Sequence, residues 1–315
     1  MAKYTFLVPA YKPDFLDKAL KSMLGQSFED FEIIVSNDCS PYDIKSIVKR
    51  NNDNRLKYRE NLKNIGGNKL VDHWNLLIDL CQSSYLIIAA DDDIYERNFL
   101  QDVDVLAKKF PYVDVIRTRT RRIDSSDEVT DIEGIFETYS SHLDAVYNSF
   151  CSDQIWCVGN YVFKTKTLKQ KGGCVNFPCA WFSDLATALM MSENGICYTQ
   201  NYGFNFRLSE RNISNSKKNK FIDRQKLYAT IQFGDWIYNF FSRIENVVEI
   251  LSHRRKEFAK HRAESLIYST IGDYGWAISS FELIKIYLKI NKWPFFSKRS
   301  FFKNYLLAAL ARRLD

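Results

Sequence analysis

The first half of the chain alternates continuous apolar runs with stretches in which apolar residues recur every three or four positions. Apolar runs of strand length occupy 4–10 (YTFLVPA), 31–36 (FEIIVS) and 85–90 (YLIIAA), and helical spacing lies between them, as over 15–26. Continuous apolar runs are typical of strands that are covered on both faces. The alternation therefore predicts an α/β fold with a doubly wound, mostly parallel sheet.

The same patterns give the expected elements of this part of the chain. The expected strands are 4–10, 31–36, 55–59, 85–90 and 113–117, and the expected helices are 15–26, 43–50, 69–81, 98–110 and 183–193. Asp14 is a candidate cap for the first helix. A hairpin is expected over 116–129, with Ser125, Ser126 and Asp127 in its turn.

A different pattern begins near residue 216, at the polar stretch SNSKKNK. From Phe221 onward the spacing of apolar residues is helical almost to the end, with breaks near Gly272, Gly275 and Pro294. We therefore expect one domain over 1–215 and a helical C-terminal region over 216–315.

The composition is that of a globular protein. With 46% hydrophobic and 26% charged residues in 315, the chain can bury a core, which excludes the disordered and low-complexity classes. No apolar run approaches the roughly 18 residues of a membrane-spanning helix, and the amino terminus lacks a signal-peptide pattern. Seven cysteines without a Cys-x-x-Cys pair favour reduced thiols. These observations predict a cytoplasmic protein.

The basic charge is concentrated at the C-terminal end. Residues 281–315 carry eight lysines and arginines against two acidic residues, which accounts for the whole net charge of +6. The last part, 291–315, also carries Trp293 and several phenylalanines. Such a segment can lie on an anionic membrane surface as a peripheral anchor, or it can pack as a helix on the rest of the protein. No motif that reads nucleic acid occurs, so no nucleic-acid partner is expected.

Acidic residues follow two of the expected buried strands. Asp38 comes directly after 31–37, and Asp91, Asp92 and Asp93 come directly after 85–90. In a parallel sheet both groups fall at the carboxyl edge, where ligands collect. Mg²⁺ and Mn²⁺ are held by one or two such carboxylates together with substrate phosphates. Asp38 alone could equally start a turn, but three adjacent aspartates repel one another unless they are solvated or meet a cation.

Several segments in the right order resemble the family 2 glycosyltransferases of bacterial type, which have the A-type nucleotide-sugar fold. The opening FLVPAYKPDFLDKALKSMLGQSFEDFEIIVSNDCS, the middle NIGGNKLVDHWNLLIDLCQSSYLIIAADDDIY and the later FSDLATALMMSENGICYTQNYGFNFRLSERNIS carry the resemblance. It covers roughly residues 3 to 214. Each motif is weak alone, but together they are specific.

The resemblance implies a role for each matching position. The implied donor-nucleotide contacts are Pro9, Ala10, Tyr11, Asp38, Asn75 and Asp91. Asp92 and Asp93 would hold a divalent cofactor, Mn²⁺ or Mg²⁺, on the donor diphosphate. Asp184 would be the catalytic base, while Trp181 and Arg207 would contact the acceptor or a phosphate.

The implied reaction is inverting transfer of one sugar from a nucleotide-diphosphate sugar to a hydroxyl group. Uridine diphosphate is the expected nucleotide, and the acceptor would be a glycan or a lipid-linked glycan in surface polysaccharide synthesis. A single base on the face opposite the leaving group suits inversion, and a bound cation neutralises the leaving diphosphate. The absence of the family's processive Gln-x-x-Arg-Trp signature favours addition of one sugar. Arg117, Arg119 and Arg121 alternate along one strand, which predicts a solvated face or a contact with an acceptor phosphate.

Three positions depart from the family pattern. Ala90 stands where an acid of the metal motif is usual, Trp74 replaces an arginine before Asn75, and Ser209 replaces a histidine. These departures leave open a nucleotide-sugar-binding protein without transferase activity. A nucleotidyltransferase is the third alternative, but the stretch VPAYKPD lacks the glycine-rich phosphate loop that it would need.

Overall fold

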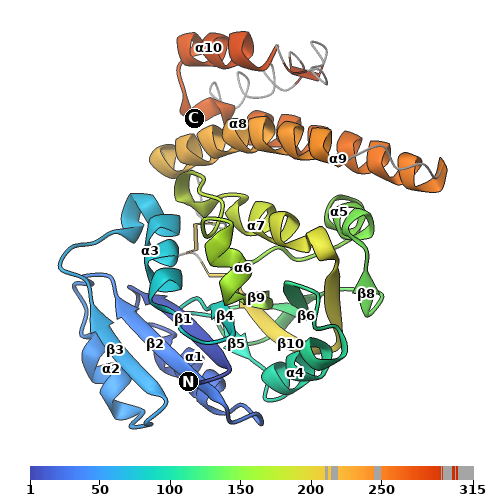
Figure 1. Cartoon of the computed structure of the whole chain (residues 1–315). Coiled ribbons are helices and arrows are strands. Elements are labelled where there is room, and N and C mark those ends of the chain that lie inside the picture. The colour runs from blue at the N-terminus through green and yellow to red at the C-terminus, as the bar shows by residue number, and fades with distance from the viewer. Residues whose placement is uncertain are drawn as a thin grey trace. The chain divides into compact units, whose positions relative to one another are not determined.

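One mixed sheet organises the first part of the chain. The computed structural model describes residues 1–209, 212–213, 219–244, 250–291, 293, 300–301 and 303. Its strands are β1 Tyr4–Ala10, β2 Phe31–Asn37, β3 Leu56–Glu60, β4 Tyr85–Ile88, β5 Ile94–Tyr95, β6 Val115–Ile123, β7 Val129–Ile132, β8 Tyr139–Ser140, β9 Tyr161–Lys164 and β10 Ile196–Arg207. The strand order is β3-β2-β1-β4-β9-β6-β10-β5, with β7 beside β6 and β8 beside β10 (Figure 1).

The four strands nearest the amino terminus form the parallel half of this sheet. β1 lies between β2 and β4, and β3 extends β2, all in parallel register. Strand β9 then pairs antiparallel with both β4 and β6, so it separates this half from the parallel pair β6 and β10. The predicted doubly wound α/β class is confirmed, while the antiparallel β9 was not expected.

Helices follow the strands much as the spacing predicts. Their bounds are α1 Leu16–Leu24, α2 Ile44–Arg50, α3 Gly66–Leu80, α4 Phe99–Lys109, α5 His142–Cys151, α6 Thr165–Gln170, α7 Ser183–Met191, α8 Lys220–Arg243, α9 Ile250–Tyr274 and α10 Ser280–Ile290. The predicted cap at Asp14 is wrong, because α1 begins after Phe15 without a side-chain cap. Asp43 does cap α2, accepting a hydrogen bond from the Ser46 N–H at 3.0 Å. The predicted hairpin corresponds to β6 and β7, with Asp127 at a φ of 70° in its turn.

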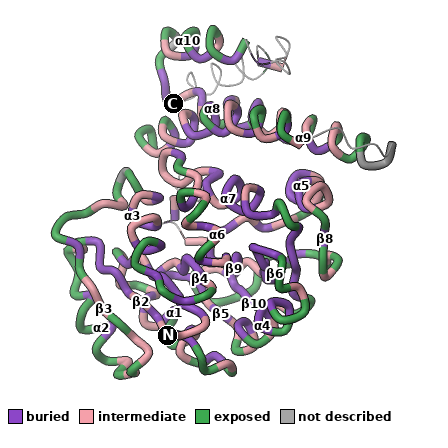
Figure 2. The backbone as a smooth tube through the Cα atoms, viewed as in Figure 1, coloured by how far each residue is buried: buried purple, intermediate pink, exposed green. Residues whose placement is uncertain are grey.

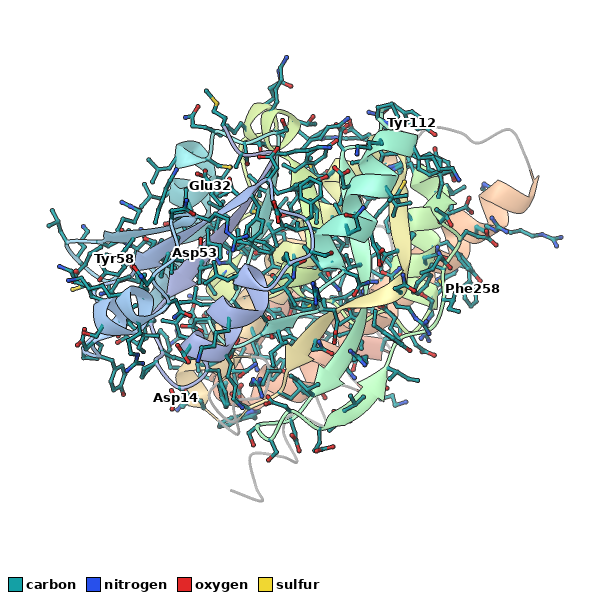
Figure 3. All side chains as sticks on the ribbon, turned by 90° about the horizontal axis from the view of Figure 1, so that it is seen from below. Asp14, Glu32, Asp53, Tyr58, Tyr112 and Phe258 are labelled. Atoms are coloured by element: carbon teal, nitrogen blue, oxygen red, sulfur yellow. The ribbon has the colours of Figure 1, made fainter. Side chains whose placement is uncertain are left out.

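Aromatic side chains fill the core between the sheet and its helices. Tyr95 lies edge-on to Phe6, Phe99 and Phe204 at ring separations of 5.0, 4.7 and 5.0 Å. A Cβ atom at Gly159 would lie 2.6 Å from the Phe204 ring, so only glycine fits there. Figure 2 shows the central strands as buried, whereas Figure 3 shows polar side chains such as Glu32 and Tyr58 on β2 and the edge strand β3.

The chain divides into two compact units. The first consists of Met1–Ala145, Asp153–Asn176 and Ser183–Ser209. The second consists of Val146–Ser152, Phe177–Phe182 and the described residues after Ser209, and in it α8 and α9 run side by side (Figure 1). Among the described helices, none is both long enough and apolar enough to cross a bilayer.

The basic aromatic tail predicted over 291–315 lies mostly outside the described residues. Two of its aromatic residues are described and are buried within the second unit. The Trp293 indole N–H donates to Asp235 on α8 at 2.8 Å, and a Cβ atom at Gly234 would lie 2.3 Å from the indole ring. Phe301 is 2% exposed and contacts Tyr287 of α10 at a ring separation of 5.0 Å. These two rings pack on helices, as the second interpretation of the tail expects.

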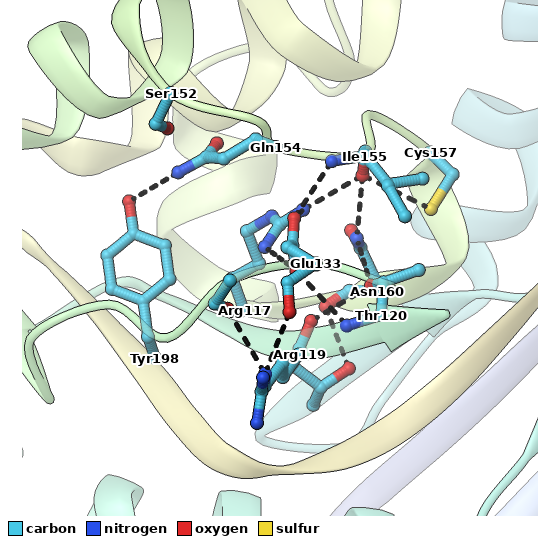
Figure 4. Close-up of polar contacts among 12 residues, drawn as sticks. Arg117, Arg119, Thr120, Glu133, Ser152, Gln154, Ile155, Cys157, Asn160 and Tyr198 are labelled. Carbon is cyan, nitrogen blue, oxygen red and sulfur yellow. Dashed lines mark hydrogen bonds and ion pairs between the residues drawn. The ribbon is translucent and has the colours of Figure 1, made fainter. Parts of the chain in front are cut away.

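A buried ion pair joins β6 to the segment after β7. The Arg117 guanidinium, 0% exposed, donates to both oxygens of Glu133, with one N–H···O distance of 2.8 Å (Figure 4). Glu133 also accepts the backbone N–H groups of Thr120 and Ile155. The predicted solvated face is therefore wrong for Arg117, because β6 is an interior strand and its side chain points into the protein.

Replacement of Glu133 by glutamine should destabilise the first unit strongly. The substitution keeps the shape but leaves the Arg117 charge buried without a counter-charge, which typically costs about 3–5 kcal/mol. Urea unfolding of Glu133→Gln measures this loss. Glu128→Gln, at an exposed position of the β6–β7 turn, is the matched control and should change stability by no more than about 0.5 kcal/mol. Equal stability of the two variants would contradict the interpretation.

Candidate functional site

The carboxyl ends of β1, β2 and β4 meet at one edge of the sheet. The Asp38 N–H donates to the Ala10 carbonyl at 2.9 Å, and the Ala89 N–H donates to the Leu7 carbonyl at 2.8 Å. Register places Ala10 opposite Asn37. The structure therefore brings the loops after these three strands together, as the sequence predicts for the residues that follow them.

Asp91 ties the loop after β4 to the loop after β1. Its Oδ2 atom accepts the backbone N–H groups of Tyr11 and Lys12 at 2.9 and 2.8 Å. Burial raises the pKa of the Asp91 carboxyl, and the Lys12 charge and these two hydrogen bonds oppose that rise. Asp91 thus fixes the backbone of the Pro9–Lys12 segment, which is predicted to line the nucleoside pocket. Lys12 itself was missed by the sequence analysis, although its position in that loop was a signal.

Asp38 is 2% exposed and is bonded through both oxygens within the protein. Oδ1 accepts from the Asn61 side-chain amide at 2.8 Å and from the Ile65 N–H at 2.9 Å, while Oδ2 accepts from the Gly66 N–H at 2.6 Å. These donors belong to the loop that leads into α3. The predicted contact of Asp38 with the donor nucleotide stays a prediction, and the observed bonds favour action through the loop 61–66.

Arg207 braces the run of three aspartates from inside the protein. Its guanidinium is 0% exposed and donates to the Asp92 carbonyl and the Asp124 carbonyl, both at 2.7 Å. Its backbone N–H donates to the Asp93 carboxylate at 2.9 Å, and an ion pair joins it to Asp127 at 2.5 Å. The predicted phosphate or acceptor contact of Arg207 is untested, and this placement favours a structural role for it.

Asp92 differs from Asp91 and Asp93 because its carboxylate is available to a ligand. Apart from its own backbone N–H, it forms no hydrogen bond among the described residues, although the residue is only 7% exposed. Burial and the neighbouring Asp91 raise its pKa to about 6, against the charges of Lys12 and Arg207. No group of three or more His, Cys, Asp or Glu side chains in the described part of the chain is arranged to hold a metal ion. A cation here would therefore take few protein ligands, which fits the donor set of Mg²⁺ or Mn²⁺ bound with a diphosphate.

Asn75 of α3 is engaged with the backbone of the segment before α7. Its Oδ1 atom accepts the Cys174 N–H at 2.8 Å, and its amide N–H donates to the Cys174 carbonyl at 3.3 Å. A Cβ atom at Gly173, where φ is 87°, would lie 2.5 Å from this side chain. The predicted nucleotide contact of Asn75 is not tested by these bonds. Trp74, at the position of the expected arginine, is buried.

Asp184 is the second residue of α7, as predicted, and it is partly exposed. Its Oδ1 atom accepts the Leu185 N–H at 2.8 Å. Burial raises the pKa of its carboxyl to about 6, while the hydrogen bond from Leu185 and the charge of Arg117 act in the opposite direction. A carboxyl group with this pKa is largely ionised at pH 7 and can still accept a proton, which is what a general base needs.

Trp181 belongs to the second unit and precedes Asp184 by three residues in the chain. Its indole N–H is buried and has no hydrogen-bond partner among the described residues. The turn around it is strained, because Cys179, Ala180 and Phe182 have φ values of 47°, 58° and 67°. Strain of this kind is concentrated at functional sites, although the sequence alone gave no sign of it.

A sheet of this order, with aspartates at the carboxyl edge of its parallel half, defines an α/β fold of the A-type nucleotide-sugar class. The family model described as "Glycosyl transferase family 2" matches residues 5–184, more than half of the chain. The chain therefore belongs to glycosyl transferase family 2.

Individual relatives agree with this assignment. The GalNAc(5)-diNAcBac-PP-undecaprenol beta-1,3-glucosyltransferase of Campylobacter jejuni is 37% identical over 99 residues, which are 30% of this chain and 30% of that protein. TarS 1–349 of S. aureus, solved with UDP-GlcNAc, has a TM-score of 0.58 at 15% identity over 99% of this chain and 92% of that chain. The mannosyltransferase PcManGT of Pyrobaculum calidifontis, solved with GDP-Man and Mn²⁺, has a TM-score of 0.55 at 14% identity, over 99% and 87%. The solved structures show the fold.

Replacement of Asp38 by alanine should lower stability as well as nucleotide affinity. Three donors lose a buried charged acceptor, and each such loss costs roughly 1–3 kcal/mol. Asp43→Ala is the matched control, because it removes one exposed capping bond worth about 1 kcal/mol. Urea unfolding and UDP calorimetry of both variants test this. Wild-type stability of Asp38→Ala would refute the positioning role, and wild-type UDP affinity would remove the residue from the nucleotide site.

Proposed function

We propose that this protein transfers a single sugar, with inversion, from a nucleotide-diphosphate sugar to a hydroxyl group of an acceptor. One observation carries the proposal. The first unit holds two carboxyl groups in different environments, Asp92 at the sheet edge and Asp184 on α7, and neither forms an ion pair with a described residue. Two such groups can divide the work of leaving-group stabilisation and proton removal. A binding protein without transferase activity needs no group in the second role.

The proposed donor is a uridine diphosphate sugar bound at the carboxyl edge of β1, β2 and β4. Asp91 supports this, because it presents the backbone of Tyr11 and Lys12 in a fixed geometry. The similar solved structures are complexes with UDP-GlcNAc and with GDP-Man, which supports a nucleotide-sugar donor without selecting its base. The proposal does not specify which sugar the donor carries.

Asp92 would hold Mn²⁺ or Mg²⁺ on the donor diphosphate, with Asp93 beside it. When bound, a divalent ion supplies positive charge to the leaving diphosphate. The Asp92 carboxylate suits this role because no other described residue is hydrogen-bonded to it. Asp93 already accepts the Arg207 N–H, so it offers one remaining oxygen and fixes the loop. The Mn²⁺ of PcManGT is consistent with such a cofactor.

Replacement of Asp92 by alanine should make UDP binding insensitive to Mn²⁺. Loss of one carboxylate from a site with few protein ligands weakens metal affinity by about 10- to 100-fold. Calorimetry of UDP with and without Mn²⁺ measures this without relying on turnover. Asp131→Ala, which removes an exposed carboxylate paired with Arg122, should behave like wild type. Full activity of the wild type in EDTA would contradict the proposed role of Asp92 as a metal ligand.

Asp184 would take the proton from the acceptor hydroxyl as that oxygen attacks the anomeric carbon of the donor sugar. The bond to the nucleoside diphosphate breaks on the opposite face, so configuration inverts, and the proton ends on an Asp184 carboxylate oxygen. The alternative role of Asp184 is a plain helix cap. Its hydrogen bond to the adjacent Leu185 N–H is not the usual capping bond, which reaches two or three residues ahead.

Replacement of Asp184 by asparagine should lower turnover by roughly 10² to 10⁴ while leaving folding and UDP binding unchanged, because an amide cannot accept the proton. In the wild type, kcat/KM should rise with pH and level off above about pH 6, where the carboxylates of Asp184 and Asp92 form, because the pKa of each is raised to about 6. The groups that interact with Asp184 across this range are Arg117, Tyr161, Cys157 and Cys174.

The matched control is Asp102→Asn, which changes the same residue type in the first turn of α4. It should keep wild-type turnover and the wild-type pH profile. Retention of more than a tenth of wild-type turnover by Asp184→Asn would show that another residue is the base. Donor binding without any transfer or hydrolysis by the wild type would favour the nucleotide-sugar-binding protein instead.

The proposed acceptor is a glycan or a lipid-linked glycan in polysaccharide synthesis. The Campylobacter relative acts on an undecaprenol-linked glycan, but it matches this chain over 30% of its length, so its substrate supports the class of acceptor only. Trp181, with its unpartnered indole N–H, is the proposed acceptor contact. Arg207 is a weaker candidate, because its guanidinium is bonded inside the protein.

A peripheral position on the inner face of the cell membrane would suit such an acceptor. The basic residues of 291–315 support it, whereas the buried Trp293 and Phe301 are not available to a bilayer. Phosphatidylglycerol vesicles should sediment the full chain at low salt and release it at high salt, since charge attraction is screened over about 10 Å at 0.1 M. Equal sedimentation of a chain that ends at Ile290 would remove the tail from this role.

A further inference from the structure

Lys226 of α8 is a buried lysine whose ammonium group faces two aromatic rings. The residue is 1% exposed, and its Nζ atom lies 4.8 Å from the Trp181 ring centroid and 4.9 Å from that of Tyr274. The nearest acid, Asp223, is 4.0 Å away, and Nζ donates no hydrogen bond among the described residues. The charge of Asp223 and cation–π attraction to the two rings both compensate for the burial of this charge.

Two buried polar groups without hydrogen-bond partners lie beside the Lys226 ammonium. They are the Trp181 indole N–H and the Asp223 Oδ1 atom, both unpartnered among the described residues. Buried polar groups are normally satisfied, so a set of this kind needs an explanation. A ligand rich in hydroxyl groups carries the acceptors and donors that these atoms lack.

One of the two rings beside Lys226, that of Trp181, belongs to a turn that packs on α8 and has a strained backbone. Phe182 stacks on Phe233 of α8 at a ring separation of 4.6 Å, and Phe177 meets the same ring edge-on at 6.1 Å. Between them, Cys179 and Ala180 have left-handed backbone angles. The aromatic contacts fix the ends of the turn, and the Lys226 cation fixes the indole in its middle.

Stability alone does not account for a lysine here. Burial lowers the pKa of Lys226, which shows that the surroundings disfavour its charge. A methionine has similar length, and apolar replacement of buried charges is often neutral or stabilising. A fixed ring orientation is the property that the ammonium adds.

We infer that Lys226 is a positioning residue, which holds the Trp181 indole so that its N–H donates a hydrogen bond to a hydroxyl or ring oxygen of the acceptor sugar. The inference rests on the proposed function, since it takes Trp181 as the acceptor contact. It adds that Lys226 acts on the affinity for the acceptor through Trp181. Donor binding and attack by water need neither residue.

The test compares transfer from a panel of UDP-sugars and GDP-mannose to a panel of octyl glycosides, including octyl β-N-acetylgalactosaminide, with hydrolysis of the same donors. Lys226→Met and Trp181→Phe should each raise the acceptor KM by roughly 5- to 30-fold, the range of a desolvated cation–π contact or one hydrogen bond. Hydrolysis by Lys226→Met should stay at the wild-type rate. Lys226→Arg, which keeps the charge, should recover most of the affinity, and the double variant should resemble Trp181→Phe alone.

Lys260→Met is the matched control, because Lys260 lies on α9 and forms an ion pair with Glu257 but no described ring contact. Its acceptor KM should equal that of the wild type. An unchanged acceptor KM in Lys226→Met, or equal losses of transfer and hydrolysis, would overturn the inference and leave the proposed function intact. Hydrolysis by the wild type without use of any octyl glycoside would also overturn it. Neither hydrolysis nor transfer by the wild type would reject the proposed function itself, and this inference with it.

Discussion

The carboxylate of Asp91 holds two strand ends together, and the candidate site depends on that link. Parallel strands bring their carboxyl ends to one edge, but they do not fix the loops that follow. Asp91 fixes them by accepting two consecutive backbone N–H groups from the loop after β1. The position of Asp92 follows, since it is the next residue. Arg207 completes the arrangement by bonding the Asp92 carbonyl from behind.

Much of the fold could be predicted from the sequence, because the apolar runs 4–10, 31–36 and 85–90 have strand length and little ambiguity. Strand β9 could not be predicted, because it has only four residues, Tyr161–Lys164. So short a run does not show the direction in which a strand pairs. The expectation for Arg117 also failed. The three alternating arginines share one face of β6, and the sequence does not show that Arg117 alone is buried there against Glu133.

The sequence predicted which residues lie at the candidate site, but it predicted their contacts less well. The sequence placed Asp38, Asp91 and Asp92 at one edge, and the structure has them there. It could not tell that both oxygens of Asp38 are bonded to the loop before α3 while the Asp92 carboxylate is not so engaged, because the backbone N–H donors lie 27 and 28 residues further along the chain. The burial of Lys226 could not be predicted from the sequence either. A lysine in a helical pattern is usually exposed, and only packing reveals its burial among aromatic rings.

The antiparallel insertion of β9 has a consequence for synthesis of the chain. Strand β4 pairs with β1 on one side, and its other neighbour, β9, follows only after more than 70 further residues. At about 5–20 residues per second, a ribosome takes roughly 4–15 s to make that stretch. During this interval the apolar edge Tyr85–Ile88 has no partner of its own, and an unpaired apolar edge invites pairing with another chain. The nascent protein is thus most exposed to aggregation between these two points of its synthesis.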